Sequence, residues 1–203
     1  MITWQAQLVE YLKAISIAIV LALFIRSFVV QAFHIPSSSM VPTLLEGDRV
    51  LVTKFAFGIR NPFTNNVFFE TWSPARGDVV IFQYPDDHKT DFVKRVIGLP
   101  GETVQIVSGK IMINGEVIED LHGRYYNPHQ VRSRDYGPAV VPQGQYFMMG
   151  DNRDYSNDSR VWGFVDASLL RGKAWRLYWS WDSAQSIPFS KRLRVGRLGQ
   201  KIE

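Results

Sequence analysis

The sequence predicts a mostly β protein attached to one N-terminal transmembrane helix, and two observations lead to this fold class. The run AISIAIVLALFI at residues 14–25 carries no charge, and apolar residues resume after Arg26 and Ser27 and continue to Val30. Beyond Val30 the chain consists of short runs rich in valine, isoleucine and aromatic residues, each bounded by glycine, proline, asparagine or aspartate. No window there has a long amphipathic helical period, so strands and turns are expected.

Residues 14–30 are expected to form an uncleaved membrane anchor. The segment is slightly shorter than the roughly 20 residues that span a bilayer, but Arg26 can extend its charge to the headgroups and Trp4 suits the opposite interface. The alternative is a cleaved signal peptide, which the mixed charges of Glu10 and Lys13 do not favour. Because one basic residue flanks each end of the segment, its orientation stays open.

The chain of 203 residues has room for this anchor, residues 1–32, and one globular domain, residues 33–203. It contains no cysteine, which excludes disulfides, cysteine-ligated zinc and thiol catalysis. The net charge is +4, but basic residues cluster only in SKRLRVGRLGQK at residues 190–201, which we expect to be a solvated tail. A lipid bilayer is therefore an expected partner and nucleic acid is not.

The globular domain is expected to contain a core sheet and a smaller β insert at about residues 104–144. Asn114 and Gly115 favour a two-residue hairpin turn, because a type I′ turn needs positive φ at both positions. Residues 121–144 are polar and rich in turn residues, which is typical of a surface excursion. The expected strands lie at residues 49–57, 77–84, 91–99, 102–107, 110–113, 116–118, 145–150 and 172–179.

The stretch IPSSSMVPT at residues 35–43 follows the anchor closely. A serine run in a loop is usually a solvated turn, and the alternative is a nucleophile. The serine motifs of α/β-hydrolases and penicillin-binding proteins are absent, and the four histidines have no metal-ligand spacing, although a triad assembled at long range stays open. An extended chain gains at most about 3.6 Å per residue, so Ser39 lies within about 30 Å of the membrane face.

Lys94 is the candidate base for such a serine. It lies in the expected strand DFVKRVIG, and strand periodicity puts Phe92 and Val96 on its own face. An apolar pocket would lower the pKa of its amine and supply the neutral form that can accept a proton. The alternative is an edge strand that turns the lysine to solvent.

A third cluster of polar residues is GDNRDYSNDSR at residues 150–160. Its mixed charges suit either a solvated loop or a hydrogen-bonded network packed against the core, because apolar residues flank it on both sides. Its serines could also orient a lysine.

Together these residues resemble the bacterial type I signal peptidases, also called leader peptidases. The resemblance covers nearly the whole chain after about Ala14 and rests on an anchor followed by four motifs in order. These are PSSSMVPTL at residues 36–44, RGDVVIF at 76–82, KRVIGLPGE at 94–102 and GDNRDYSNDSR at 150–160. It implies a membrane-bound serine endopeptidase with a signal-peptidase-type β catalytic domain and no cofactor or metal. Its substrates would be the signal peptides of exported preproteins, cut after small residues at positions −1 and −3.

The resemblance also implies a role for individual residues. Ser39 would be the nucleophile, Lys94 its general base, Ser37 an oxyanion donor and Ser156 the residue that orients the lysine amine. A supporting ionic network would comprise Asp158, Arg160, Arg95 and Asp151. The pockets for the −1 and −3 side chains would be lined by Phe33, Ile35, Leu44, Phe92 and Val93.

The family orientation implies a single-pass protein of the cytoplasmic (inner) membrane with its catalytic domain on the extracytoplasmic, periplasmic side. The insert is shorter than in the long proteobacterial members and lacks their disulfide, and one anchor replaces their two. Three alternatives stay open: a conjugation-associated processing peptidase of the same superfamily, a self-cleaving repressor-type protease, and a membrane-tethered β binding module with an inert serine loop.

Overall fold

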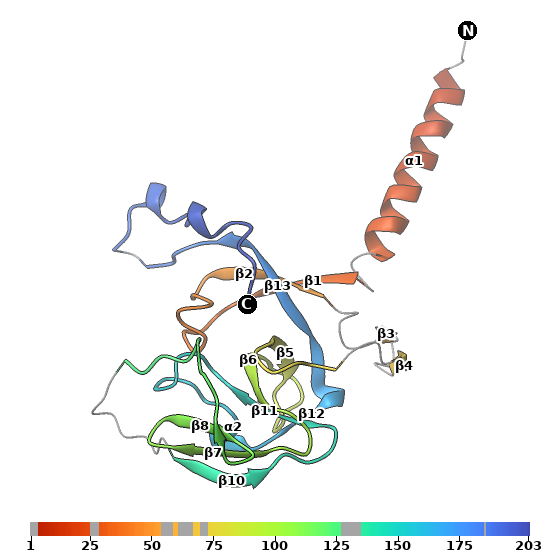
Figure 1. Cartoon of the computed structure of the whole chain (residues 1–203). Coiled ribbons are helices and arrows are strands. Elements are labelled where there is room, and N and C mark those ends of the chain that lie inside the picture. The colour runs from red at the N-terminus through yellow and green to blue at the C-terminus, as the bar shows by residue number, and fades with distance from the viewer. Residues whose placement is uncertain are drawn as a thin grey trace.

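The structure is a computed structural model, which describes residues 4–24, 29–53, 59–60, 67–69, 73–126, 135–184 and 186–203 (Figure 1). It consists of one N-terminal helix and a mostly β domain, so the predicted fold class is confirmed. The helix α1 extends away from the β domain, and the smaller of the two main sheets lies at the opposite end of the molecule (Figure 1).

Helix α1 runs from Trp4 to Phe24. Its segment Gln7–Phe24 has a mean hydropathy of 1.8 and none of it is buried in the protein, so it is long and apolar enough to cross a membrane. Its 21 residues would extend about 30 Å, the thickness of a bilayer core. The helix thus begins ten residues before the expected start at Ala14, while Arg26 lies outside the described residues.

Val30 belongs to a strand and not to the anchor. Strand β1, Val30–His34, pairs with β2, Asp48–Thr53, with Val30 opposite Thr53. The expected end of the anchor at residue 32 therefore falls inside β1. The physical reason is that the short, partly apolar stretch from Val30 to His34 suits a half-buried edge strand as well as a helix end.

The main sheet has seven strands in the order β1-β2-β13-β5-β6-β11-β12, and all its pairs are antiparallel. The long β13 is irregular in register with both neighbours, as expected of a strongly twisted strand. The other members are β5 Val79–Gln83, β6 Asp91–Gly98, β11 Gln145–Met149, β12 Val165–Asp166 and β13 Leu170–Ser180.

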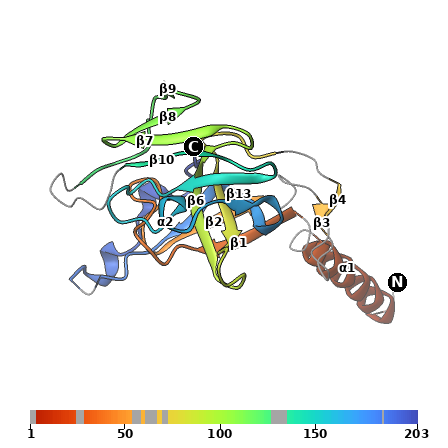
Figure 2. The same cartoon turned by 90° about the horizontal axis from the view of Figure 1, so that it is seen from below.

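A separate four-stranded sheet, in the order β10-β7-β8-β9, occupies most of the expected insert and packs on one side of the main sheet (Figure 2). Asn114 and Gly115 have φ values of 53° and 87°, which confirms the predicted hairpin turn. Tyr136–Val140 was expected to be irregular but forms β10 on the edge of β7. The other strands are β7 Thr103–Val107, β8 Lys110–Ile113 and β9 Glu116–Val117.

The smaller elements are short. Strands β3, Ile59–Arg60, and β4, Val67–Phe69, form a two-stranded ribbon, and helix α2 covers Ser159–Trp162. The second half of the expected strand at residues 49–57 lies outside the described residues, as do residues 127–134 of the expected surface excursion.

Strand β6 contributes to both faces of the main sheet. Val93 packs in one apolar cluster with Ile35 and Leu44, whereas Phe92 and Val96 pack in a second cluster on the opposite face. This confirms the predicted alternation along the strand. A third cluster joins the end of β6 and β11 to the smaller sheet.

The C-terminal residues are not the solvated tail that their basic composition suggested. Ile202 is buried in the same cluster as Ile35, and Leu177 of β13 donates a backbone hydrogen bond to Gln200. Arg194 and Arg197 form ion pairs with buried or half-buried aspartates. The interpretation as a tail was wrong because Arg194 and Arg197 pair with specific carboxylates outside the segment, those of Asp182 and Asp48.

Candidate active site

The serine run lies on a loop between β1 and β2 that is closed at both ends. The backbone N–H of Ile35 donates to the Asp48 carbonyl at 2.9 Å, and the N–H of Gly47 donates to the Ile35 carbonyl at 2.9 Å. Between these points Met40 and Leu44 are fully buried in the core and fix the loop. Ser39 is 7% exposed while its two neighbours in the run are exposed, so this serine faces inward and is not part of a solvated turn.

The hydroxyl of Ser39 lies within hydrogen-bond distance of the amine of Lys94. Lys94 Nζ lies 2.8 Å from Ser39 Oγ and donates to the Val93 carbonyl at 3.0 Å. It also lies 5.3 Å from the centroid of the Phe92 ring. Strand β6 is interior to the sheet and Lys94 is only 4% exposed, which contradicts the edge-strand alternative.

The electrostatics of this site favour a neutral lysine. Burial lowers the pKa of the Lys94 amine from 10.5 to about 8, although the nearby carboxylates of Asp158 and Asp151 act in the opposite direction. With a pKa of about 8, about a tenth of the amine is neutral at pH 7, compared with about one part in 3,000 for an unperturbed lysine. A neutral amine can accept the Ser39 proton across the observed distance.

Arg95 and Asp151 form a buried ion pair behind the lysine. Arg95 Nε donates to Asp151 Oδ1 at 2.8 Å and Nη2 donates to Oδ2 at 2.7 Å, a bidentate arrangement. The same carboxylate accepts a hydrogen bond from Thr43 Oγ1 at 2.6 Å. The structure thus brings the expected pair together and ties it to the serine loop.

Asp158 and Arg160 form the second ion pair of the GDNRDYSNDSR segment. Arg160 donates to both Asp158 oxygens, from Nε at 2.8 Å and from Nη2 at 2.9 Å, and the Gly150 N–H donates to Asp158 Oδ2 at 3.0 Å. The segment is therefore a network packed against the core and not a solvated loop. Such buried carboxylates need these partners, because an unpaired charge there would be costly.

Ser156 is buried near the dyad but makes no hydrogen bond to the lysine. Its Oγ has no hydrogen-bond partner among the described residues, and it packs against Gly150. A side chain at Gly150 would collide with both Ser156 and the Ser39 carbonyl, so only glycine allows this close approach. The role of Ser156 in orienting the amine stays a prediction.

Two residues of the motifs, Asn152 and Thr43, make contacts at the serine loop that were not predicted. Asn152 donates from Nδ2 to the Ser38 carbonyl at 3.1 Å and from its backbone N–H to the Ser39 carbonyl at 3.1 Å. The Thr43 hydroxyl, as described, reaches Asp151. Both residues lie inside the motifs on which the family resemblance rests. An asparagine or a threonine in a sequence does not show which distant backbone carbonyl or carboxylate it will contact.

The five expected pocket residues do not form one wall. Ile35, Leu44 and Val93 are buried together and Phe33 packs against them, but Phe92 belongs to the cluster on the other face of β6. Leu44 has no exposed surface, so in this structure it supports the loop from beneath. Their contact with substrate residues stays a prediction.

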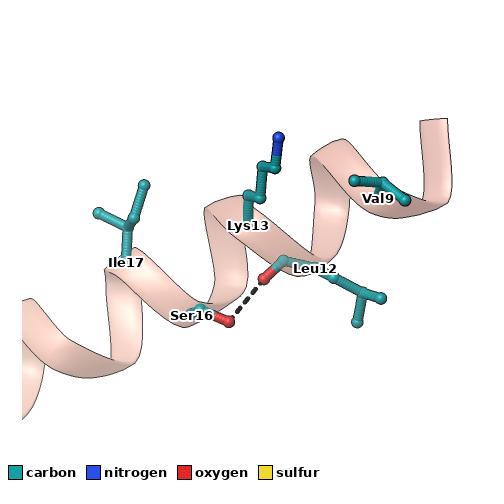
Figure 3. Close-up of a pocket in the computed structure, with 5 residues that line it drawn as sticks. All are labelled: Val9, Leu12, Lys13, Ser16 and Ile17. Atoms are coloured by element: carbon teal, nitrogen blue, oxygen red, sulfur yellow. Dashed lines mark hydrogen bonds between the residues drawn. The ribbon is translucent and has the colours of Figure 1, made fainter. Parts of the chain in front are cut away.

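A shallow, open surface pocket of about 390 Å³ lies along the exposed helix α1 (Figure 3). It is lined by Val9, Leu12, Lys13, Ser16 and Ile17, all from that helix. Neither Ser39 nor Lys94 lines it, so it is separate from the candidate site. Among the described residues no group of three histidine, aspartate or glutamate side chains could hold a metal ion.

A serine hydroxyl within hydrogen-bond distance of a buried lysine amine defines a nucleophile beside a base, the arrangement of a serine hydrolase. The chain belongs to the signal peptidase family, peptidase S26, whose model matches residues 8–179. It is therefore a serine peptidase, which contradicts the inert binding module.

Two relatives agree with this membership. Signal peptidase I of Pseudomonas fluorescens is 40% identical over 94% of this chain and 79% of its own length. Signal peptidase I of Pseudomonas aeruginosa is 38% identical over 93% of this chain and 78% of its own length. The crystal structure of a signal peptidase I from Enterococcus faecalis V583 is 32% identical and covers 50% of this chain and 96% of its own, with a TM-score of 0.43.

Proposed function

We propose that the chain is a membrane-bound signal peptidase that removes N-terminal signal peptides from exported preproteins, cutting after small residues at positions −1 and −3. The observation that carries the proposal is the 2.8 Å separation of Ser39 Oγ and Lys94 Nζ in a buried site. The two relatives named signal peptidase I, matched over 79% and 78% of their own length, support the same substrate class.

In the proposed mechanism the Ser39 hydroxyl attacks the scissile carbonyl while neutral Lys94 takes its proton. The resulting ammonium returns a proton to the leaving amine, which gives an ester between Ser39 and the signal peptide. Lys94 then deprotonates a water molecule that hydrolyses this ester and regenerates the serine. Because one group acts as both base and acid, its pKa must lie near the working pH.

The oxyanion is proposed to be held by the Ser39 backbone N–H and by the Ser37 hydroxyl. Ser37 Oγ lies 3.4 Å from Ser39 Oγ, which places it beside the reacting atom. Donors fixed before the reaction stabilise the developing charge without reorganisation. The ion pairs Arg95–Asp151 and Asp158–Arg160 are proposed to hold the backbone around the dyad.

The proposed location is the cytoplasmic (inner) membrane, with α1 as a single span and the catalytic domain on the periplasmic side. The apolar helix ends at Phe24, 15 residues before Ser39, so an extended chain would keep Ser39 within about 54 Å of the helix end; this supports a site near the membrane. A signal peptide is itself in the bilayer, so tethering the enzyme there raises the effective concentration of substrate at the site.

The test uses the purified full chain in liposomes with a radiolabelled preprotein that has alanine at positions −1 and −3. We expect a single cut after the −1 alanine, read from the N-terminal sequence of the product. An intact preprotein, or a cut elsewhere, would contradict the proposed function. Cleavage of a conjugation pilin precursor in place of every secretory preprotein in a substrate panel would favour the alternative, a conjugation-associated processing peptidase.

The proposed pockets predict a change in specificity. Replacing Val93 and Ile35 together by alanine removes methyl groups next to the serine loop, so larger side chains at −1 or −3 should become acceptable or the cut should move. The measurement is cleavage of a preprotein set with alanine, valine or leucine at each position. Val107→Ala, at an exposed position of the smaller sheet, is the matched control. Unchanged site selection would show that other residues form the walls.

A further inference from the structure

The C-terminal segment makes direct contact with the loop that carries Ser39. The C-terminus lies beside β2 and β13 (Figure 1), and Arg197 reaches the loop from there. Arg197 Nη2 donates to the Thr43 carbonyl at 2.9 Å and to Asp48 Oδ2 at 2.6 Å, and Nε lies 3.3 Å from Asp48 Oδ1. One guanidinium therefore joins Thr43 on the loop to Asp48, the first residue of β2, five residues further along the chain.

The carboxylate of Asp48 requires a positively charged side chain beside it. This carboxylate is fully buried, and it accepts hydrogen bonds from the Leu45 N–H at 2.8 Å and from Ser180 Oγ at 2.6 Å. These neutral donors do not balance its charge, and a buried carboxylate without a counter-charge is strongly unfavourable. The Arg197 guanidinium supplies that charge, while Arg194 is more distant at 3.8 Å and pairs mainly with Asp182.

Thr43 also connects the C-terminal segment to strand β6, which carries Lys94. Arg197 holds the Thr43 carbonyl, and the Thr43 hydroxyl donates to Asp151. Asp151 in turn forms the bidentate pair with Arg95, the residue that follows Lys94. A series of hydrogen bonds thus links the C-terminal segment to the serine loop on one side and to the lysine strand on the other.

We propose that Arg197 is a positioning residue that fixes the serine loop and so sets the separation of Ser39 from Lys94. This inference rests on the proposed function and adds to it a role for the C-terminal segment. Without the guanidinium, the Thr43 end of the loop loses its tie to the C-terminal segment, and Ser39, four residues before Thr43, loses one of the contacts that fix its position. A displacement of about 1 Å at a reacting group can cost about a hundredfold in rate.

The test compares Arg197→Lys, Arg197→Met and the control Arg192→Met in the liposome assay. Lysine keeps the counter-charge for Asp48, but a point charge cannot reproduce the fork that also holds the Thr43 carbonyl. Arg192 lies on the same segment and donates to the Ile187 carbonyl, away from the serine loop. Rates are expressed per folded protein, with the folded fraction taken from circular dichroism and gel filtration.

We expect kcat to fall on the order of 10-fold in Arg197→Lys and up to 100-fold in Arg197→Met, with KM within twofold of wild type. Arg192→Met should match wild type. A merely structural role would lower the folded fraction and leave kcat per folded protein unchanged, and that result would overturn the proposal. A raised KM with unchanged kcat would also overturn it.

Arg197→Lys decides the question if Arg197→Met does not fold, because the lysine variant keeps the charge at Asp48. A kcat of folded Arg197→Lys within twofold of wild type contradicts the positioning role. Wild-type protein in the same assay keeps the two proposals separate: if it cleaves the preprotein, the function holds whatever the Arg197 variants do.

Discussion

Lys94→Met is expected to give a folded, membrane-inserted protein without measurable peptidase activity. Methionine keeps an unbranched apolar stem of similar length in the buried site, so the packing around β6 should survive. It has no group that can accept the Ser39 proton. Lys94→Arg should be equally inactive, because a guanidinium stays protonated at any accessible pH. The measurement is preprotein cleavage at equal membrane levels, with circular dichroism as the check on folding.

Lys110→Met is the matched control for this prediction. Lys110 is an exposed strand lysine on β8 in the smaller sheet, so the same substitution should leave cleavage unchanged there. Near wild-type activity in a folded Lys94→Met or Lys94→Arg protein would show that lysine is not the base, and the proposed mechanism would be wrong.

Ser39→Ala is expected to abolish turnover. Of the three serines in the run, Ser39 is the one whose hydroxyl lies 2.8 Å from the lysine amine and whose side chain is buried. The loop is fixed at Met40, Leu44 and the Asn152 contacts, so no neighbouring hydroxyl can move into its place. The variant should still bind preprotein, because the substitution removes a single oxygen atom.

Alanine substitutions of the two neighbouring serines should lower the cleavage rate to different extents and serve as controls. Ser37→Ala removes one proposed oxyanion donor and should lower the rate by about 10² to 10³, or about 3 to 4 kcal/mol. Ser38→Ala should be nearly silent, because its side chain is exposed and Asn152 holds its backbone carbonyl. The measurement is cleavage of one preprotein by the three variants. An inactive Ser38→Ala beside an active Ser39→Ala would mean that the nucleophile is the wrong serine.

Much of the fold could be predicted because its signals are local. The alternation of Phe92, Val93 and Lys94 along one strand predicted which side chains share a face, and the structure follows it. Asn114 and Gly115 predicted a turn from backbone sterics alone. Ser39 and Lys94 are 55 positions apart, so no local pattern predicts that they meet. That prediction rested on the family resemblance.

The remainder depends on partners far away in the sequence. The cluster of arginines near the C-terminus looked solvated because its composition does not show which carboxylates it meets in the fold; Arg197 pairs with Asp48, which lies 149 positions away. The contact of Asn152 with the Ser38 carbonyl spans 114 positions and involves a backbone atom, which no side-chain pattern can indicate. The start of β1 at Val30 was missed because an apolar run looks the same in a helix end and in a short strand.

The pH dependence of kcat/KM tests the claim that a buried, neutral Lys94 is the base of Ser39. Burial lowers the pKa of this amine to about 8, and the active form is the neutral one, so kcat/KM should rise with pH and reach half of its plateau near pH 8. The wild-type chain in liposomes is measured between pH 6 and about pH 10.5, with stability checked at each end. A profile that keeps rising tenfold per unit to pH 10 would indicate an unperturbed lysine and contradict the account, and so would a profile that is flat across the range.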